Sequence, residues 1–69
     1  IKPTVFNSAD EAAVELFMQG KISYLGISDA IAKAMSEIKN IENPTISDIW
    51  ETDKLAREIV YRFEKESLI

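Results

Sequence analysis

Apolar residues recur along the chain at intervals of three and four positions, a spacing that places them on one face of an α-helix. Three segments carry such a stripe: Ala9, Ala12, Ala13, Leu16 and Phe17 in the first, Ile31, Ala34, Met35 and Ile38 in the second, and Leu55 or Ala56, Ile59, Val60 and Phe63 in the third. The pattern predicts three helices that share one core.

The first helix is predicted to begin at Asn7 or Ser8. Ser8 and Glu11 have the spacing of a capping box, in which the hydroxyl accepts from the Glu11 N–H and the carboxylate reaches back to the start of the helix. Asn7 is an equally good N-cap chemically, so the boundary stays open by one residue. Residues 1–6 are interpreted as a lead-in, because Pro3 disfavours the helical conformation at the residue before it.

Gly20 is expected to end the first helix, because glycine readily adopts the left-handed conformation that commonly closes a helix. Residues 21–27 are interpreted as an extended connector that tucks Ile22 and Ile27 under the helices. The alternation of Ile22 and Tyr24 also suits a strand, but a single short strand would have no partner here.

The remaining boundaries follow from capping and loop residues. Residues 28–29, a serine and an aspartate, are predicted to cap the second helix, and residues 40–45 have the composition of a loop. Residues 47–50 suggest a short helical turn, and residues 52–53 are predicted to open the last and longest helix. The expected fold is an all-α bundle of three helices plus a short helical turn, forming a single domain over residues 1–69.

Charge and composition narrow the range of functions. The chain has no cysteine and no histidine, which removes disulfides, thiolate nucleophiles and the usual zinc ligands. Eight basic and twelve acidic residues give a net charge of −4, which argues against nucleic acid or an anionic membrane surface as partner. No apolar run approaches the roughly 20 residues that span a bilayer. We therefore expect a cytoplasmic protein with neither nucleic-acid nor membrane partners.

Two groups of carboxylates are candidates for a cation or acid–base site: Asp10 with Glu11, and Asp48 with Glu51 and Asp53. Acidic residues near helix starts also complement the helix dipole, and we favour this structural interpretation. Adjacent helical residues diverge by about 100°, so Asp10 and Glu11 are poorly placed to share one ligand.

The aromatic and glycine residues are the next candidates. Trp50, Tyr24 and Tyr61 could stack a base or a sugar, but no basic residue adjoins Trp50, and we interpret it as a core anchor. Gly20 and Gly26 lack the spacing and the following Lys-Ser/Thr of a phosphate-binding loop.

A helix-turn-helix interpretation of residues 28–39 would use Lys33 and Lys39 as phosphate contacts. The acidic net charge and the lack of an Arg, Gln or Asn cluster on that helix disfavour it. The residues alone thus indicate a structural or interaction module, with no catalytic, cofactor-binding or metal-binding residue.

A family resemblance makes this interpretation more specific. The matching positions are Phe6-Asn7-Ser8-Ala9-Asp10-Glu11, Ala13-Val14, Phe17, Lys21, Ile22, Tyr24, Ile27, Asp48-Ile49, Asp53 and Ala56-Arg57-Glu58. In order and spacing they resemble the C-terminal helical domain of 1-deoxy-D-xylulose 5-phosphate reductoisomerase, over about residues 3–61. The chain departs from the family's usual Leu, Ala and Asn at Phe6, Ser8 and Asp10. Because the family usually has alanine at the position of Ser8, the resemblance favours Asn7 over Ser8 as the N-cap of the first helix.

The resemblance implies an oxidoreductase of the non-mevalonate isoprenoid pathway. Such an enzyme uses NADPH and Mg²⁺ or Mn²⁺ to convert 1-deoxy-D-xylulose 5-phosphate to 2-C-methyl-D-erythritol 4-phosphate. Its nucleotide-binding and catalytic domains would precede this segment, so no functional residue carries over and these 69 residues alone are expected to be inactive. Their expected partner is the catalytic domain of the same chain, which they would brace. A start at Ile1 and not at Met favours this interpretation over the alternative, a free-standing helical protein-interaction module.

The resemblance also implies a missing helix. The family's domain resembles a four-helix bundle whose first long helix would lie upstream of Pro3. Three helices would then leave an apolar groove around Phe17, Met35 and Phe63, so we expect the isolated chain to form a two-fold dimer. Phe17 and Ile59 are expected to be core anchors.

Overall fold

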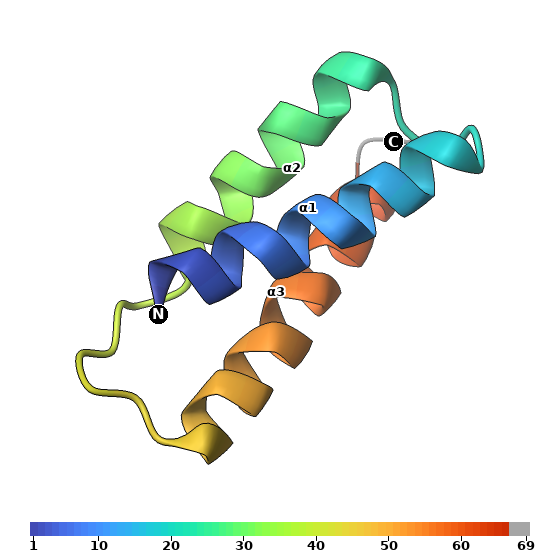
Figure 1. Cartoon of the computed structure of the whole chain (residues 1–69). Coiled ribbons are helices and arrows are strands. Elements are labelled where there is room, and N and C mark those ends of the chain that lie inside the picture. The colour runs from blue at the N-terminus through green and yellow to red at the C-terminus, as the bar shows by residue number, and fades with distance from the viewer. Residues whose placement is uncertain (67–69) are drawn as a thin grey trace.

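The computed structural model describes residues 1–66, which form three α-helices in an up-down-up arrangement (Figure 1). The helices are α1 (Lys2–Met18), α2 (Tyr24–Glu37) and α3 (Ile46–Glu66), and each packs against the other two. The described part of the chain contains no strand. The predicted all-α bundle of three helices is confirmed, with one difference: the expected short turn at residues 47–50 is the first part of α3.

The helices α1 and α3 lie side by side and run in the same direction, whereas α2, which connects them in sequence, runs in the opposite direction (Figure 1). Cross-contacts show the parallel pairing: Ser8 of α1 bonds Asp53 of α3, and one turn further Glu11 pairs with Arg57. This pairing places side chains 45 and 46 positions apart in sequence along one seam.

Alanine dominates the core. Among the described residues, six of the ten buried apolar residues are alanines, and all six are fully inaccessible to solvent: Ala9, Ala12, Ala13, Ala30, Ala34 and Ala56. Ile59 and Val60 are the largest fully buried side chains. Because alanine has only a methyl group, the three helices can approach closely, and the core is narrow.

Several predicted core positions are confirmed, and the prediction for Phe17 is wrong. Ile59 is buried, and Ile22 and Ile27 pack against the core as expected, although Ile27 lies in α2 and not in the connector. Phe17 is 37% exposed: its ring meets Tyr24 edge-on, with centroids 5.8 Å apart, at the rim between α1 and α2. A narrow alanine core has no room for a phenyl ring, so the ring packs at its edge. Ala56, and not its alternative Leu55, is the buried member of the third stripe.

The predicted start of the first helix is also wrong. The helix α1 begins at Lys2, and the Ile1 carbonyl accepts from the N–H groups of Thr4 and Val5. Pro3 lies in the first turn of α1, where backbone N–H groups have no acceptor within the helix, so the missing N–H of proline costs no hydrogen bond. Proline is therefore favourable at this helix start. Neither Asn7 nor Ser8 is a cap: Asn7 is exposed in mid-helix, and the buried Ser8 donates its hydroxyl proton to Asp53.

The end of α1 is as predicted, but α2 starts earlier than expected. Gly20 adopts a left-handed φ of 75°, and the N–H of Lys21 returns to the Leu16 carbonyl at 2.9 Å, a Schellman closure. The N-cap of α2 is Ser23, whose Oγ accepts from the Gly26 N–H at 3.0 Å. The expected caps at residues 28–29 therefore lie inside the helix, and the predicted connector is shorter by about one turn.

The last helix begins before the predicted residues 52–53. Thr45 and Asp48 form a reciprocal capping box: the Asp48 N–H donates to Thr45 Oγ1 at 3.0 Å, and the Thr45 N–H donates to Asp48 Oδ2 at 2.9 Å. Thr52 is 5% exposed inside α3, so its side chain belongs to the core. The predicted loop at residues 40–45 is confirmed.

Candidate functional site

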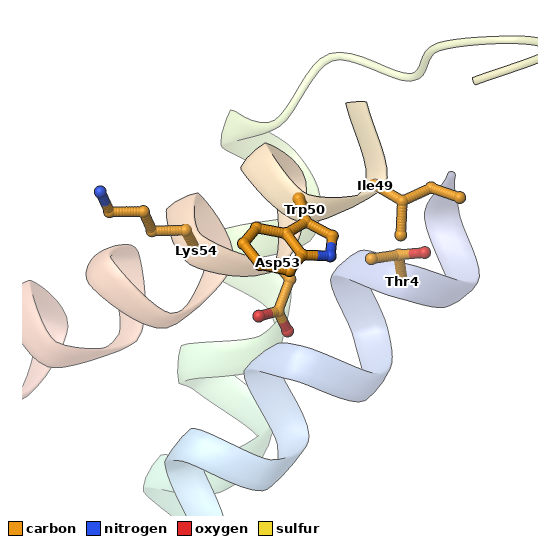
Figure 2. Close-up of a pocket in the computed structure, with 5 residues that line it drawn as sticks. All are labelled: Thr4, Ile49, Trp50, Asp53 and Lys54. Atoms are coloured by element: carbon orange, nitrogen blue, oxygen red, sulfur yellow. The ribbon is translucent and has the colours of Figure 1, made fainter. Parts of the chain in front are cut away.

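An open hollow of about 500 Å³ lies between the beginnings of α1 and α3. Figure 2 shows its lining: Thr4, Ile49, Trp50, Asp53 and Lys54. The Asp53 carboxylate reaches toward α1, whereas the Lys54 ammonium points away from it (Figure 2). The indole of Trp50 is 78% exposed, so its predicted role as a core anchor is wrong.

Four polar side chains join α1 to α3 next to this hollow, and we call them the polar seam: Ser8, Glu11, Asp53 and Arg57. The Ser8 hydroxyl donates to Asp53 Oδ1, and Arg57 Nε donates to the same oxygen at 3.1 Å. Arg57 also extends to Glu11 Oε1, with 3.4 Å between the nitrogen and the oxygen. The hydrogen bond from Ser8, assisted by the Arg57 guanidinium, holds the pKa of the Asp53 carboxyl below its usual value of 3.8.

A second, smaller hollow of about 300 Å³ lies between the end of α2, the following loop and α3. Its lining consists of Ile38, Lys39, Ile41, Asp48, Glu51, Thr52 and Leu55. Asp48 caps α3 here, and Lys39 lies among the acidic residues of the lining. Lys39 thus lies after the end of α2, beside acidic residues, and not on the helix that the helix-turn-helix interpretation would use.

The candidate carboxylates do not converge on one ligand. Asp48 is occupied by the helix cap, and Asp53 and Glu11 belong to the polar seam. Asp10, the neighbour of Glu11, belongs neither to the helix cap nor to the polar seam. Within residues 1–66, no group of three or more carboxylates is arranged to hold a metal ion.

The candidate aromatic residues lie at different ends of the bundle. Trp50 shares its hollow with Thr4 near the start of α1, whereas Tyr24 contacts Phe17 near the end of the same helix. These two rings are therefore no common platform for a base or a sugar. Tyr61, on α3, is 39% exposed.

The helix α2 contains one basic residue, Lys33, so it has no continuous positive face. Lys33 pairs with Glu37 at 3.2 Å, and Glu37 is also approached by Arg62 of α3.

None of the helices in residues 1–66 is long and apolar enough to cross a membrane.

Sequence reasoning missed the polar seam, although one signal was present. Ser8 lies one position before Ala9 and four before Ala12, inside the apolar stripe of α1. A hydroxyl on a buried face requires a partner. Asp53 provides it from 45 positions away, a contact that local spacing does not reveal.

Comparison with known proteins agrees with the resemblance noted in the sequence. The family model described as DXP reductoisomerase C-terminal domain matches residues 1–59. The chain belongs to this family. The resemblance is thereby confirmed over nearly the whole chain.

Relatives of this C-terminal domain family are similar over most of the chain but are far longer. The reductoisomerase of Halalkalibacterium halodurans is 43% identical over 63 residues, which are 91% of this chain and 16% of that protein. Those of Caldanaerobacter subterraneus subsp. tengcongensis and Bacillus subtilis are 48% and 45% identical over 58 residues, each covering 84% of this chain and 15% of the relative. All three are named 1-deoxy-D-xylulose 5-phosphate reductoisomerase. The chain thus spans about a sixth of their length. No solved structure matches it.

Proposed function

We propose that this DXP reductoisomerase C-terminal domain is a non-catalytic, structural part of a cytoplasmic, NADPH-dependent reductoisomerase and braces the catalytic part of the same chain. The observation that carries the proposal is the match of residues 1–59 to the C-terminal domain family. In the proposed reaction the whole enzyme would convert 1-deoxy-D-xylulose 5-phosphate to 2-C-methyl-D-erythritol 4-phosphate, with Mg²⁺ or Mn²⁺ and NADPH held by other domains.

The contacts of the polar residues support a structural role. Asp48 holds the start of α3, and Asp53 and Arg57 tie α3 to α1. Groups committed to hydrogen bonds within and between helices are poorly suited to proton transfer or to metal binding, because a ligand would have to replace those partners.

The isolated chain is expected to bind neither NADPH nor Mn²⁺. Calorimetric titration of each ligand should give only the heat of dilution, since the sequence has no phosphate-cradling loop and residues 1–66 contain no convergent carboxylates. The control is a full-length reductoisomerase that contains this domain, which should bind both. A saturable signal tighter than about 100 µM, roughly −5.5 kcal/mol, would contradict the proposal.

We further propose that the isolated chain forms a two-fold dimer. The supporting features are Trp50, exposed by 78%, and the hollow beside it. The side chain and the hollow lie on one face, so each copy could insert its indole into the hollow of the other, as an isologous contact requires. The groove expected around Phe17, Met35 and Phe63 is a less suitable surface, because Met35 and Phe63 pack against the core.

Sedimentation equilibrium over a hundred-fold concentration range tests the dimer. The parent chain is expected to approach twice 7.8 kDa, and Trp50→Ala is expected to remain at 7.8 kDa. Leu25→Ala is the matched control, because Leu25 is exposed by 76% on α2, and this variant should still dimerise. A parent chain that stays monomeric throughout, or a Leu25→Ala variant that also becomes monomeric, would contradict this contact.

A further inference from the structure

The contact between α1 and α3 combines two kinds of side chain. The two helices have eight described buried apolar residues, and half of these are alanines, Ala12 and Ala56 among them. Such a surface favours close approach but gives little direction, because apolar burial depends on area and not on orientation. The directional contacts come from the polar seam: Ser8, Glu11, Asp53 and Arg57.

The buried hydroxyl of Ser8 requires a hydrogen-bond partner within the seam. Its side chain is 4% exposed, and its hydroxyl donates to Asp53. If α1 moved away from α3 while Ser8 stayed out of water, the Ser8 hydroxyl would be left without an acceptor. Leaving a buried hydroxyl unpaired costs more free energy than a typical hydrogen bond contributes. The Asp53 carboxylate accepts from two donors, one on each helix.

We propose that the polar seam is an acid-sensitive clasp that holds α1 against α3. Its central element is the ionised Asp53 carboxylate, which accepts from Ser8 of α1 and from Arg57 of α3, while Arg57 extends to Glu11 of α1.

The charged groups around Asp53 determine the direction of the pH effect. Arg57 faces it from α3, and Glu11 from α1 lies beyond the guanidinium. Lys54 lines the same hollow but points away (Figure 2), and none of the α2 charges in the described contacts reaches Asp53. The pKa of Asp53 is lowered in the folded chain, so its contribution to stability is complete above the usual value of 3.8 and is lost as the pH falls through the folded value.

Thermal melting from pH 7 to pH 2.5, followed by circular dichroism, tests the clasp. Asp53→Asn is expected to melt about 5 °C below the parent chain at pH 7. The difference should shrink as the pH falls below 3.8, because the parent then loses the same charge. Asp29→Asn is the matched control, since Asp29 is an exposed carboxylate on α2, and its melting temperature should follow that of the parent at every pH.

Two local measurements separate a clasp from a general loss of stability. Ser8→Ala removes the hydroxyl and introduces a strong helix former, so this variant should fold. A carboxyl NMR titration of the variant should show the Asp53 midpoint raised toward 3.8. Amide hydrogen exchange in Asp53→Asn should accelerate near Ser8 in α1 more than near Ala30 and Ala34 in α2. An unchanged Asp53 midpoint in Ser8→Ala, or a melting difference as large at pH 2.5 as at pH 7, would overturn the proposal.

Discussion

Ile59→Ala is expected to leave most of the chain unfolded at 37 °C. Ile59 is one of the two largest fully buried side chains, and it lies on the longest helix. Truncation removes apolar burial and leaves a cavity, which together cost about 2–5 kcal/mol. A 69-residue domain rarely has more than about 3–5 kcal/mol of stability from its core. Thermal and urea melts followed by circular dichroism measure the loss.

Leu55→Ala is the matched control for this substitution. Leu55 precedes Ile59 by one turn of α3 but is 42% exposed, so its truncation leaves no closed cavity and should cost under about 1 kcal/mol. The same reasoning applies to Phe17→Ala, because Phe17 was expected to be a core anchor like Ile59 but is 37% exposed. If Ile59→Ala and Leu55→Ala melt together, the described core is wrong.

Ala34→Leu is expected to destabilise the bundle by about 1–3 kcal/mol, although it adds apolar surface. Ala34 is fully buried on α2, where the helices approach closely. Three further carbon atoms have no room there, and the helices must separate or the side chain must leave its preferred rotamer. Urea unfolding measured by circular dichroism gives the free-energy difference.

Ala32→Leu tests whether packing is the cause. Ala32 is two residues away on the same helix and is exposed, and leucine has nearly the helix propensity of alanine. Its unfolding midpoint should stay close to that of the parent chain. A stabilising effect of Ala34→Leu would show that the core has unfilled space and would contradict the alanine-based account of helix approach.

The number of helices was predictable because their apolar stripes are strongly periodic. Ala13, Leu16, Ala34 and Ile59 all lie on the predicted faces, and all are buried. Periodicity identifies the face of a helix but not the width of the contact. Phe17 belongs to the same stripe as Leu16, yet its ring is left at the rim of a core that alanines make narrow.

The helix starts were less predictable, since competing local signals had equal chemical merit. Pro3 can follow an extended residue or lie in the first turn of a helix, and here it lies in the first turn of α1. Ser8 and Glu11 have the spacing of a capping box, but the buried partner Asp53 claims the hydroxyl. Ser28 could cap α2 as well as Ser23, and only the fold shows which serine does.

The polar seam and the hollow depend on the pairing of α1 with α3. Asp53 was assigned to the dipole of a helix start, whereas it lies two turns inside α3 and serves α1. Trp50 was expected in the core because large aromatic residues usually pack there. Its position on α3 directs it to the outside, and this direction follows from a helix that starts at Ile46 and not at residues 52–53.

The exposure of Trp50 also gives the chain a built-in optical reporter. It is the only tryptophan in the sequence, and most of its indole is in contact with water in the folded state. In the folded monomer, the fluorescence emission of Trp50 should therefore resemble that of the unfolded chain. A shift of the emission to shorter wavelength would instead report that something has covered the face shared by α1 and α3. Any partner that binds there can thus be followed without an added label.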